Sequence, residues 1–135
     1  MKKYQHIVQY YETDKMGITH HSNYIRMMEE ARIDFFDQLG WGYDKMEEQG
    51  IISPVVSINC EYKKTTTFKN TIDIIVNVKQ LSRVKMTLEY QLTCNDEIVC
   101  ESTSSHCFLN EDGKVISVAK QYPQLYQLLK ELLVN

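Results

Sequence analysis

A chain of 135 residues with 43% hydrophobic residues suffices for one domain with a substantial core, so we expect a single domain over residues 1–135. The formal net charge of -3 argues against nucleic-acid binding, which depends on neutralising many phosphates. No stretch has the uninterrupted apolar run of a membrane span, and residues 1–6 do not resemble a signal peptide, so we predict a cytoplasmic protein without a membrane partner.

The first predicted element is a strand over residues 6–11, with β-forming residues on both faces. The chain then breaks at Asp14 and Gly17, and Ser22 or Asn23 is the predicted N-cap of a helix. A carboxylate thus lies beside a helix N-terminus, where free amides can polarise a carbonyl while the carboxylate activates water or attacks directly. Most Asp-x-x-Gly segments are only capped turns, so the spacing alone leaves the role of Asp14 open.

The helix is predicted over residues 23–39, because apolar residues recur there at three- and four-residue steps and Gly40 follows. Its length of roughly 25 Å is enough to cross a whole sheet. We interpret its apolar stripe as part of the core and not as a cofactor surface. Residues 42–50 favour a short second helix that ends at Gly50.

The second half of the chain is predicted to be mostly β-structure. Predicted strands cover residues 52–62, 72–79, 84–94 and 97–109, and a turn at Asp112-Gly113 leads into residues 114–118. Strict alternation in the second and third of these strands indicates an antiparallel sheet with one buried face. Residues 63–70 fit either a twisted strand end or a loop, and Pro123 begins a predicted helix with a one-sided leucine face. The predicted class is α+β, with a helix packed on one sheet face.

The four cysteines, Cys60, Cys94, Cys100 and Cys107, form no C-x-x-C pair and lie in strand-like segments. We expect free thiols that act as small buried hydrophobic groups. A zinc site formed by His20, His21 and His106 with a cysteine lacks any metal-ligand spacing, so we expect no metal.

One stretch resembles a known family. The order Tyr11, Thr13, Asp14, Gly17, His21, Asn23 and Tyr24, followed by a long helix with Glu30, Ala31 and Arg32, resembles the hotdog-fold acyl-CoA thioesterases of the 4-hydroxybenzoyl-CoA thioesterase type. The resemblance continues through residues 54–57 and the following strands. It implies a long central helix wrapped by a five- to six-stranded antiparallel sheet. It also implies homo-oligomers, either dimers or tetramers built from two dimers, with the active site at the dimer interface.

The resemblance implies hydrolysis of an acyl-CoA to free acid and CoA without a cofactor. In this hypothesis Asp14 is the general base or the nucleophile, and backbone amides near Gly17 and His21 polarise the thioester carbonyl. The imidazole of His21 has a second possible role, orienting Asp14 or the substrate. His20 and His106 are interpreted as structural. Some relatives place the carboxylate in the long helix, but because Asp14 occupies the loop, we interpret Glu29 and Glu30 as solvated or salt-bridged.

Substrate-binding residues are also implied. Tyr24 shapes the pocket wall, while Val56 and Ser57 lie near the acyl group. Candidates for binding the CoA phosphates are basic residues near strand ends, although each fits an ordinary solvated position equally well: Lys63, Lys64, Arg83 and Lys85. Two alternatives keep the fold: an acyl carrier protein thioester as substrate, or a non-catalytic acyl-CoA sensor. The acyl group itself stays open, because the pocket depends on residues of a partner chain.

Overall fold

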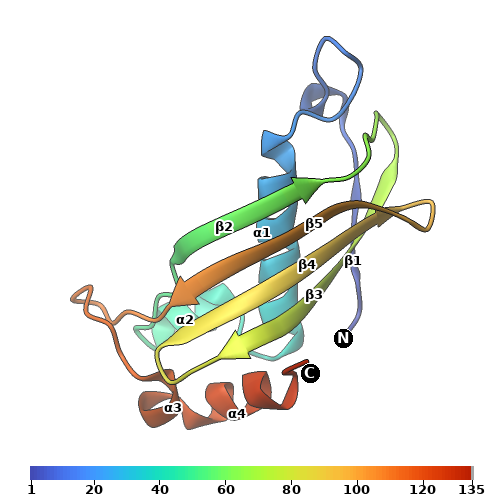
Figure 1. Ribbon diagram of the computed structural model, residues 1–135. Coiled ribbons are helices and arrows are strands. Elements are labelled where there is room, and N and C mark those ends of the chain that lie inside the picture. Colours follow the sequence, from blue (N-terminus) through green and yellow to red (C-terminus); the bar gives the residue numbers. More distant parts are fainter. Residues whose placement is uncertain (135) are drawn as a thin grey trace.

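The computed structural model describes residues 1–134, and its elements follow the predicted order (Figure 1). They are β1 (Tyr4–Ile7), the 3-10 helix η1 (Tyr10–Glu12), α1 (Ser22–Gln38), α2 (Tyr43–Glu48), β2 (Val55–Tyr62), β3 (Thr71–Leu81), β4 (Lys85–Cys94), β5 (Glu97–Cys107), α3 (Val118–Gln121) and α4 (Pro123–Glu131).

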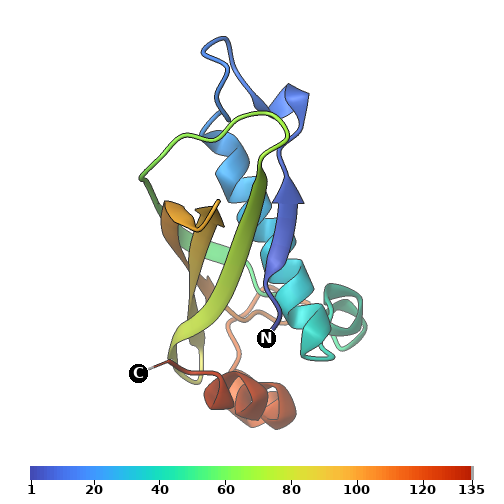
Figure 2. The same cartoon turned by 90° about the vertical axis from the view of Figure 1, so that its right-hand side faces the viewer.

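The strands form one sheet with the order β1-β3-β4-β5-β2, and every neighbouring pair is antiparallel. The sheet curves around α1, with β1 and β2 at its two edges and α3 and α4 beneath its lower end (Figures 1 and 2). This confirms the α+β class and the long helix wrapped by a sheet. Because β2 is an edge strand, one row of its backbone groups has no neighbour in the sheet.

The alternation predicted for two strands is confirmed. Ile72, Ile74, Val76 and Val78 of β3 are buried, as are the apolar residues of β4 that alternate with polar ones. They pack against the apolar stripe of α1, in which Met27, Met28, Phe35 and Phe36 are buried. The stripe is therefore core, as predicted.

The start of the chain differs from the prediction. The first strand ends at Ile7, and residues 10–12 form η1, because the Glu12 carboxylate and the Glu12 N–H both bond back to Gln9. Neither Ser22 nor Asn23 is the N-cap of α1. His21 holds that position, while the Ser22 hydroxyl bonds to His20 and the Asn23 amide donates to the Glu12 carbonyl.

The remaining connections show smaller differences. Residues 63–70 are a loop without a strand, and residues 114–118 make only an isolated bridge, between Leu109 and Val115. A short helix, α3, precedes α4, which begins at Pro123 as predicted and buries Leu125 and Leu129. All four cysteines are free thiols. None of the helices within residues 1–134 has the length and apolar composition that crossing a membrane requires.

Candidate active site

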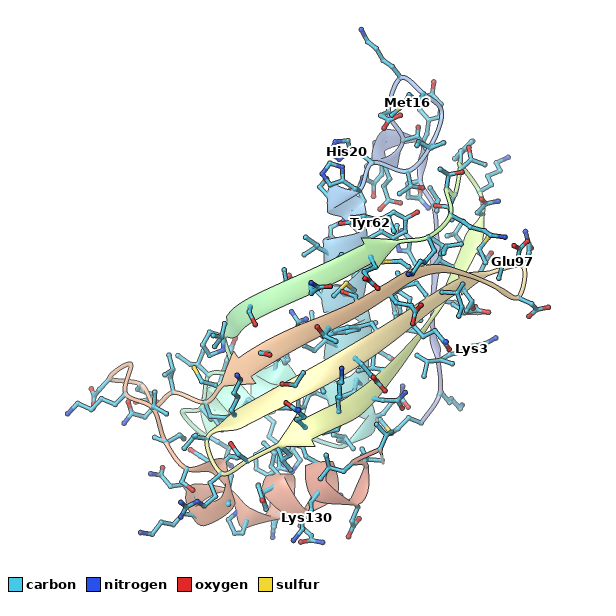
Figure 3. The ribbon with its side chains drawn as sticks, viewed as in Figure 1. Lys3, Met16, His20, Tyr62, Glu97 and Lys130 are labelled. Carbon is cyan, nitrogen blue, oxygen red and sulfur yellow. The ribbon has the colours of Figure 1, made fainter. Side chains whose placement is uncertain are left out.

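An open groove of about 360 Å³ lies where the loop of residues 13–20 meets the end of β2. Its walls are Asp14, Met16, Ile18, Thr19, His21, Tyr24, Tyr62, Lys63, Lys64 and Thr65. Figure 3 shows Met16 near the tip of this loop, His20 at the beginning of α1 and Tyr62 on β2 below them. Five of the predicted site residues therefore share one groove: Asp14, His21, Tyr24, Lys63 and Lys64.

Asp14 occupies a tight turn. Its N–H donates to the Ile18 carbonyl (2.9 Å), and its Oδ1 accepts the Met16 N–H (2.8 Å). Its Oδ2 makes no hydrogen bond with any residue in 1–134, so one carboxylate oxygen is available to a ligand. The N–H of Gly17 donates to the Asp14 carbonyl (2.9 Å), and Gly17 has a φ of 78°. This amide is engaged in the turn, so Gly17 supplies a backbone conformation that favours glycine.

His21, at the start of α1, lines the groove. The N–H groups of Asn23 and Tyr24 bond to the His20 and His21 carbonyls, and the Ser22 N–H faces Nδ1 of His20 at 3.3 Å. Within the described residues, the N–H of His21 has no acceptor. It lies at the positive end of a 17-residue helix, where free amides favour a negatively charged oxygen.

Aromatic rings form one wall of the groove. The Tyr62 ring lies edge-on to His21 (5.9 Å between centroids) and 5.5 Å from Tyr24, and its hydroxyl donates to the His21 carbonyl at 3.4 Å. Burial raises the pKa of Tyr24. Burial and the neighbouring Cys60 thiol raise the pKa of Tyr62 to about 12. Both phenols therefore stay neutral near pH 7, and they line the groove without competing with Asp14 as a base.

Within one chain, the predicted phosphate-binding residues do not form a cluster. Lys63 pairs with Glu61 (3.5 Å) and Lys64 with Glu97, both beside the groove. Lys85, at the start of β4, pairs with Cys107 at the end of β5. Tyr62, which lines the groove, pairs with Cys100 near the start of β5. Arg83 precedes Lys85 in the turn between β3 and β4. These two residues therefore lie at the far end of the sheet from the groove.

Val56 and Ser57 are also distant from the groove of their own chain. They lie at the beginning of β2, and Tyr62 at its end is about 20 Å from Val56 at the usual rise per residue. Val56 is 59% exposed on the edge strand. Within one chain, Val56 and Ser57 therefore lie at the opposite end of β2 from the groove.

The other polar residues considered in the sequence have structural partners. The Tyr4 hydroxyl donates to Glu30 (3.2 Å), which also faces His6 (3.4 Å), while Glu29 is exposed. His106 is buried in β5, where Nε2 bonds to the Ser104 hydroxyl (2.7 Å). No group of three histidine, cysteine, aspartate or glutamate side chains in residues 1–134 is placed to hold a metal ion.

Three residues that line the groove or bond to its wall were not predicted from the sequence. Tyr62 appeared only as the end of a strand, and Thr19 and Thr66 carried no signal. The Thr19 and Thr66 hydroxyls bond to each other (2.7 Å), and Thr66 also bonds to the Tyr24 hydroxyl (2.8 Å). Thr66 is 47 residues from Thr19, so no local pattern indicates this contact.

A long helix inside a curved antiparallel sheet, with a carboxylate loop at the helix N-terminus, defines a hotdog-fold protein. The DHNA-CoA thioesterase of Staphylococcus aureus has this structure with a TM-score of 0.90 and 30% identity, covering 96% of this chain and 89% of the other. A hypothetical protein of Aquifex aeolicus matches with a TM-score of 0.86 and 35% identity, covering 92% and 98% of the two chains.

The chain belongs to the Thioesterase-like superfamily, whose family model matches residues 8–127. A Bacillus subtilis relative with the name "Putative acyl-CoA thioesterase YneP" is 36% identical over 118 residues, which cover 86% of each chain. The hotdog resemblance of the sequence is thereby confirmed.

Proposed function

We propose that the protein is an acyl-CoA thioesterase and that Asp14 and the His21 N–H act on the thioester together. The observation that carries this proposal is their common position. Both line the same groove, one with a free carboxylate oxygen and the other with a backbone donor that has no acceptor in residues 1–134. The names of the relatives support the substrate class.

In this mechanism the thioester carbonyl oxygen accepts the His21 N–H. As the tetrahedral intermediate forms, negative charge grows on that oxygen beside the positive end of α1. A well-placed donor of this kind is worth about 3 kcal/mol of transition-state stabilisation. The mechanism requires this amide to face the bound thioester. Because the amide is fixed at the start of α1, little reorganisation is then needed during the reaction.

Asp14 has two chemically complete routes. As a general base, Oδ2 takes a proton from water while the water oxygen attacks the carbonyl carbon; the C–S bond then breaks and CoA leaves as a thiolate that is reprotonated. As a nucleophile, Oδ2 attacks the carbonyl carbon and expels the same thiolate, and water hydrolyses the resulting anhydride. A general base typically contributes about 10²- to 10⁴-fold, which is a credible share for an activated thioester.

We further propose that the site is completed by a second copy of the chain. The edge strand β2 carries exposed Val55, Val56 and Ile58, which is an unusual surface for a strand that faces water. Antiparallel pairing of β2 with its counterpart about a two-fold axis places the start of one strand beside the end of the other. Val56 and Ser57 of one chain then border the groove of its partner.

The test is release of free thiol from a panel of acyl-CoAs with acetyl, branched, benzoyl, phenylacetyl and palmitoyl groups, using wild type and Asp14→Asn. We expect hydrolysis of at least one member and a loss of about 10²-fold or more in kcat for Asp14→Asn, with an unchanged circular dichroism spectrum. Equal turnover by the two proteins would remove Asp14 from the mechanism. No turnover of the panel by wild type would contradict the proposed substrate class, and acyl carrier protein thioesters would be tested next.

A further inference from the structure

A second carboxylate, Glu12, is fully buried only two residues before Asp14. Its Oε1 accepts the Gln9 N–H (2.7 Å) and lies 2.8 Å from Nε2 of His6, while Oε2 forms an ion pair with Arg26 of α1. Burial alone would raise the pKa of Glu12, but these hydrogen bonds outweigh that effect and lower it. A buried carboxylate with a complete set of partners is a strong geometric restraint, because losing one partner is costly.

The backbone of Glu12 makes a second set of contacts. Its carbonyl accepts the His20 N–H and the Asn23 side-chain amide, both at 2.8 Å. The chain between these contacts is a small hairpin, closed by the bridge between Thr13 and Thr19. We call residues 13–19 the Asp14 hairpin. Glu12 therefore directly precedes the hairpin, and its carbonyl also bonds to His20, the residue directly after the hairpin.

The two sets of contacts meet on the first turns of α1. Asn23 and Arg26 are three residues apart and so lie on the same face of the helix. The Glu12 carbonyl holds Asn23, and the Glu12 carboxylate holds Arg26. His21, which lines the groove, lies between the His20 and Asn23 contacts. Glu12 therefore connects the Asp14 hairpin to the first turn of α1, while bonds from Thr19 to Thr66 and from Thr67 to the Gly17 carbonyl connect the hairpin to the loop after β2.

We infer that Glu12 is a positioning residue for hydrolysis: its ion pair with Arg26 and its carbonyl contacts hold the Asp14 hairpin in register with the first turn of α1. This inference rests on the proposed function. It explains why a carboxylate that does not line the groove is fully buried two residues before Asp14. A displacement of about 1 Å between reacting groups can cost around 10²-fold in rate.

The central experiment is a double-mutant cycle with Glu12→Gln and Asp14→Asn. Glutamine keeps the size of the side chain and an oxygen for the Gln9 N–H, but it removes the charge that holds Arg26. We expect Glu12→Gln to lower kcat about 10- to 100-fold while KM changes less than about threefold. In the Asp14→Asn background the same change is expected to alter the residual rate less than about twofold, because Glu12 acts through Asp14.

Two further variants separate positioning from general stability. Glu30→Gln removes another carboxylate that faces His6 but makes no contact with the Asp14 hairpin, so kcat is expected to stay within about twofold of wild type. Arg26→Gln breaks the same ion pair from its half-exposed side and is expected to reproduce the kcat loss of Glu12→Gln. Arg26→Gln keeps the test decisive if Glu12→Gln does not fold.

Hydrogen–deuterium exchange gives a readout independent of turnover. We expect faster exchange in peptides covering the Asp14 hairpin for Glu12→Gln and Arg26→Gln, and wild-type exchange for Glu30→Gln. Unchanged exchange, or an equal rate loss in both Asp14 backgrounds, would overturn the inference. An inactive wild type would instead overturn the proposed function and with it the catalytic purpose of Glu12, while the exchange data would still decide whether Glu12 orders the hairpin.

Discussion

The backbone and the imidazole of His21 lead to different expectations for catalysis. The N–H has no acceptor within residues 1–134 and is free to bind the carbonyl oxygen, whereas the ring contacts the His20 and Tyr62 rings and makes no hydrogen bond with Asp14. Alanine keeps the N–H and removes the ring. We therefore expect His21→Ala to lower kcat less than about tenfold, far less than Asp14→Asn. Steady-state kinetics of the two variants would test this, and equal losses would instead assign catalysis to the imidazole.

His106 provides a prediction for the pH dependence of stability. Burial, with a further contribution from the Arg32 charge, lowers the pKa of His106 to about 4 from its ordinary value of 6.5. The folded state therefore favours the neutral ring, and its contribution is complete above pH 6.5 and is lost as the pH falls toward 4. The maximum loss is roughly 3 kcal/mol, from about 1.4 kcal/mol per pKa unit.

Urea unfolding of wild type and His106→Gln at pH 7 and pH 4.5 would measure this loss. The free energy of unfolding of wild type is expected to fall more than that of the variant between the two pH values. The two proteins carry the same carboxylates, so the difference between them isolates His106. Parallel decreases would show that His106 does not protonate differently in the folded and unfolded states.

Strand β5 shows how far sequence patterns predict an element. Apolar alternation identified the core-facing sides of β3 and β4, because the alternating positions that face the core carry apolar or tyrosine side chains; Thr87 of β4 is buried as well. On β5 the buried positions include Ser102, Ser104 and His106, a pattern that does not indicate burial. Their partners come from other elements: Arg32 of α1 donates to the Tyr90 hydroxyl (3.0 Å), which bonds to Ser104 (2.6 Å). Such a network depends on tertiary contacts and has no local signal.

Substitutions on the two faces of β5 test this network. Ser104 bonds to both Tyr90 and His106, so Ser104→Ala leaves Nε2 of His106 without its hydrogen-bond partner and leaves the buried Tyr90 hydroxyl with Arg32 alone. We expect it to lower the free energy of unfolding by about 1–3 kcal/mol. The neighbouring Ser105 bonds only to Thr87 on the other face, so Ser105→Ala is expected to cost less than about 1 kcal/mol. Chemical unfolding of both variants would measure the two free energies of unfolding. Equal decreases would show that the network does not contribute to stability.

The same limit applies to the loop that carries the site. The common position of Asp14 and His21 beside one groove was predictable, because both belong to one short motif at a recognisable helix start. Glu12 and Tyr62 were not. The importance of Glu12 depends on its ion pair with Arg26, 14 residues later in the chain. The place of Tyr62 in the groove depends on its contact with His21, 41 residues earlier. The predicted Ser22 or Asn23 cap was wrong for a related reason, since both side chains bond to residues of the loop.

At the scale of the whole molecule, the placement of Val56 at the far end of β2 from its own groove suggests a complementation experiment. If two chains pair through β2, each site combines Asp14 of one chain with Val56 of the other. A heterodimer of Asp14→Asn and Val56→Trp then contains one site with both native residues and one with neither. Two different affinity tags allow such heterodimers to be purified after co-expression, and light scattering would verify their mass.

We expect each homodimer to have low activity and the heterodimer to recover about half of the wild-type kcat, because one of its two sites is intact. If each site lay within one chain, one site of the heterodimer would carry Asp14→Asn and the other Val56→Trp, and neither would be intact. Recovery of activity therefore requires that each site take residues from both chains. Heterodimer activity no higher than that of the homodimers would therefore contradict a shared site, and full activity of the Val56→Trp homodimer would remove Val56 from the acyl pocket.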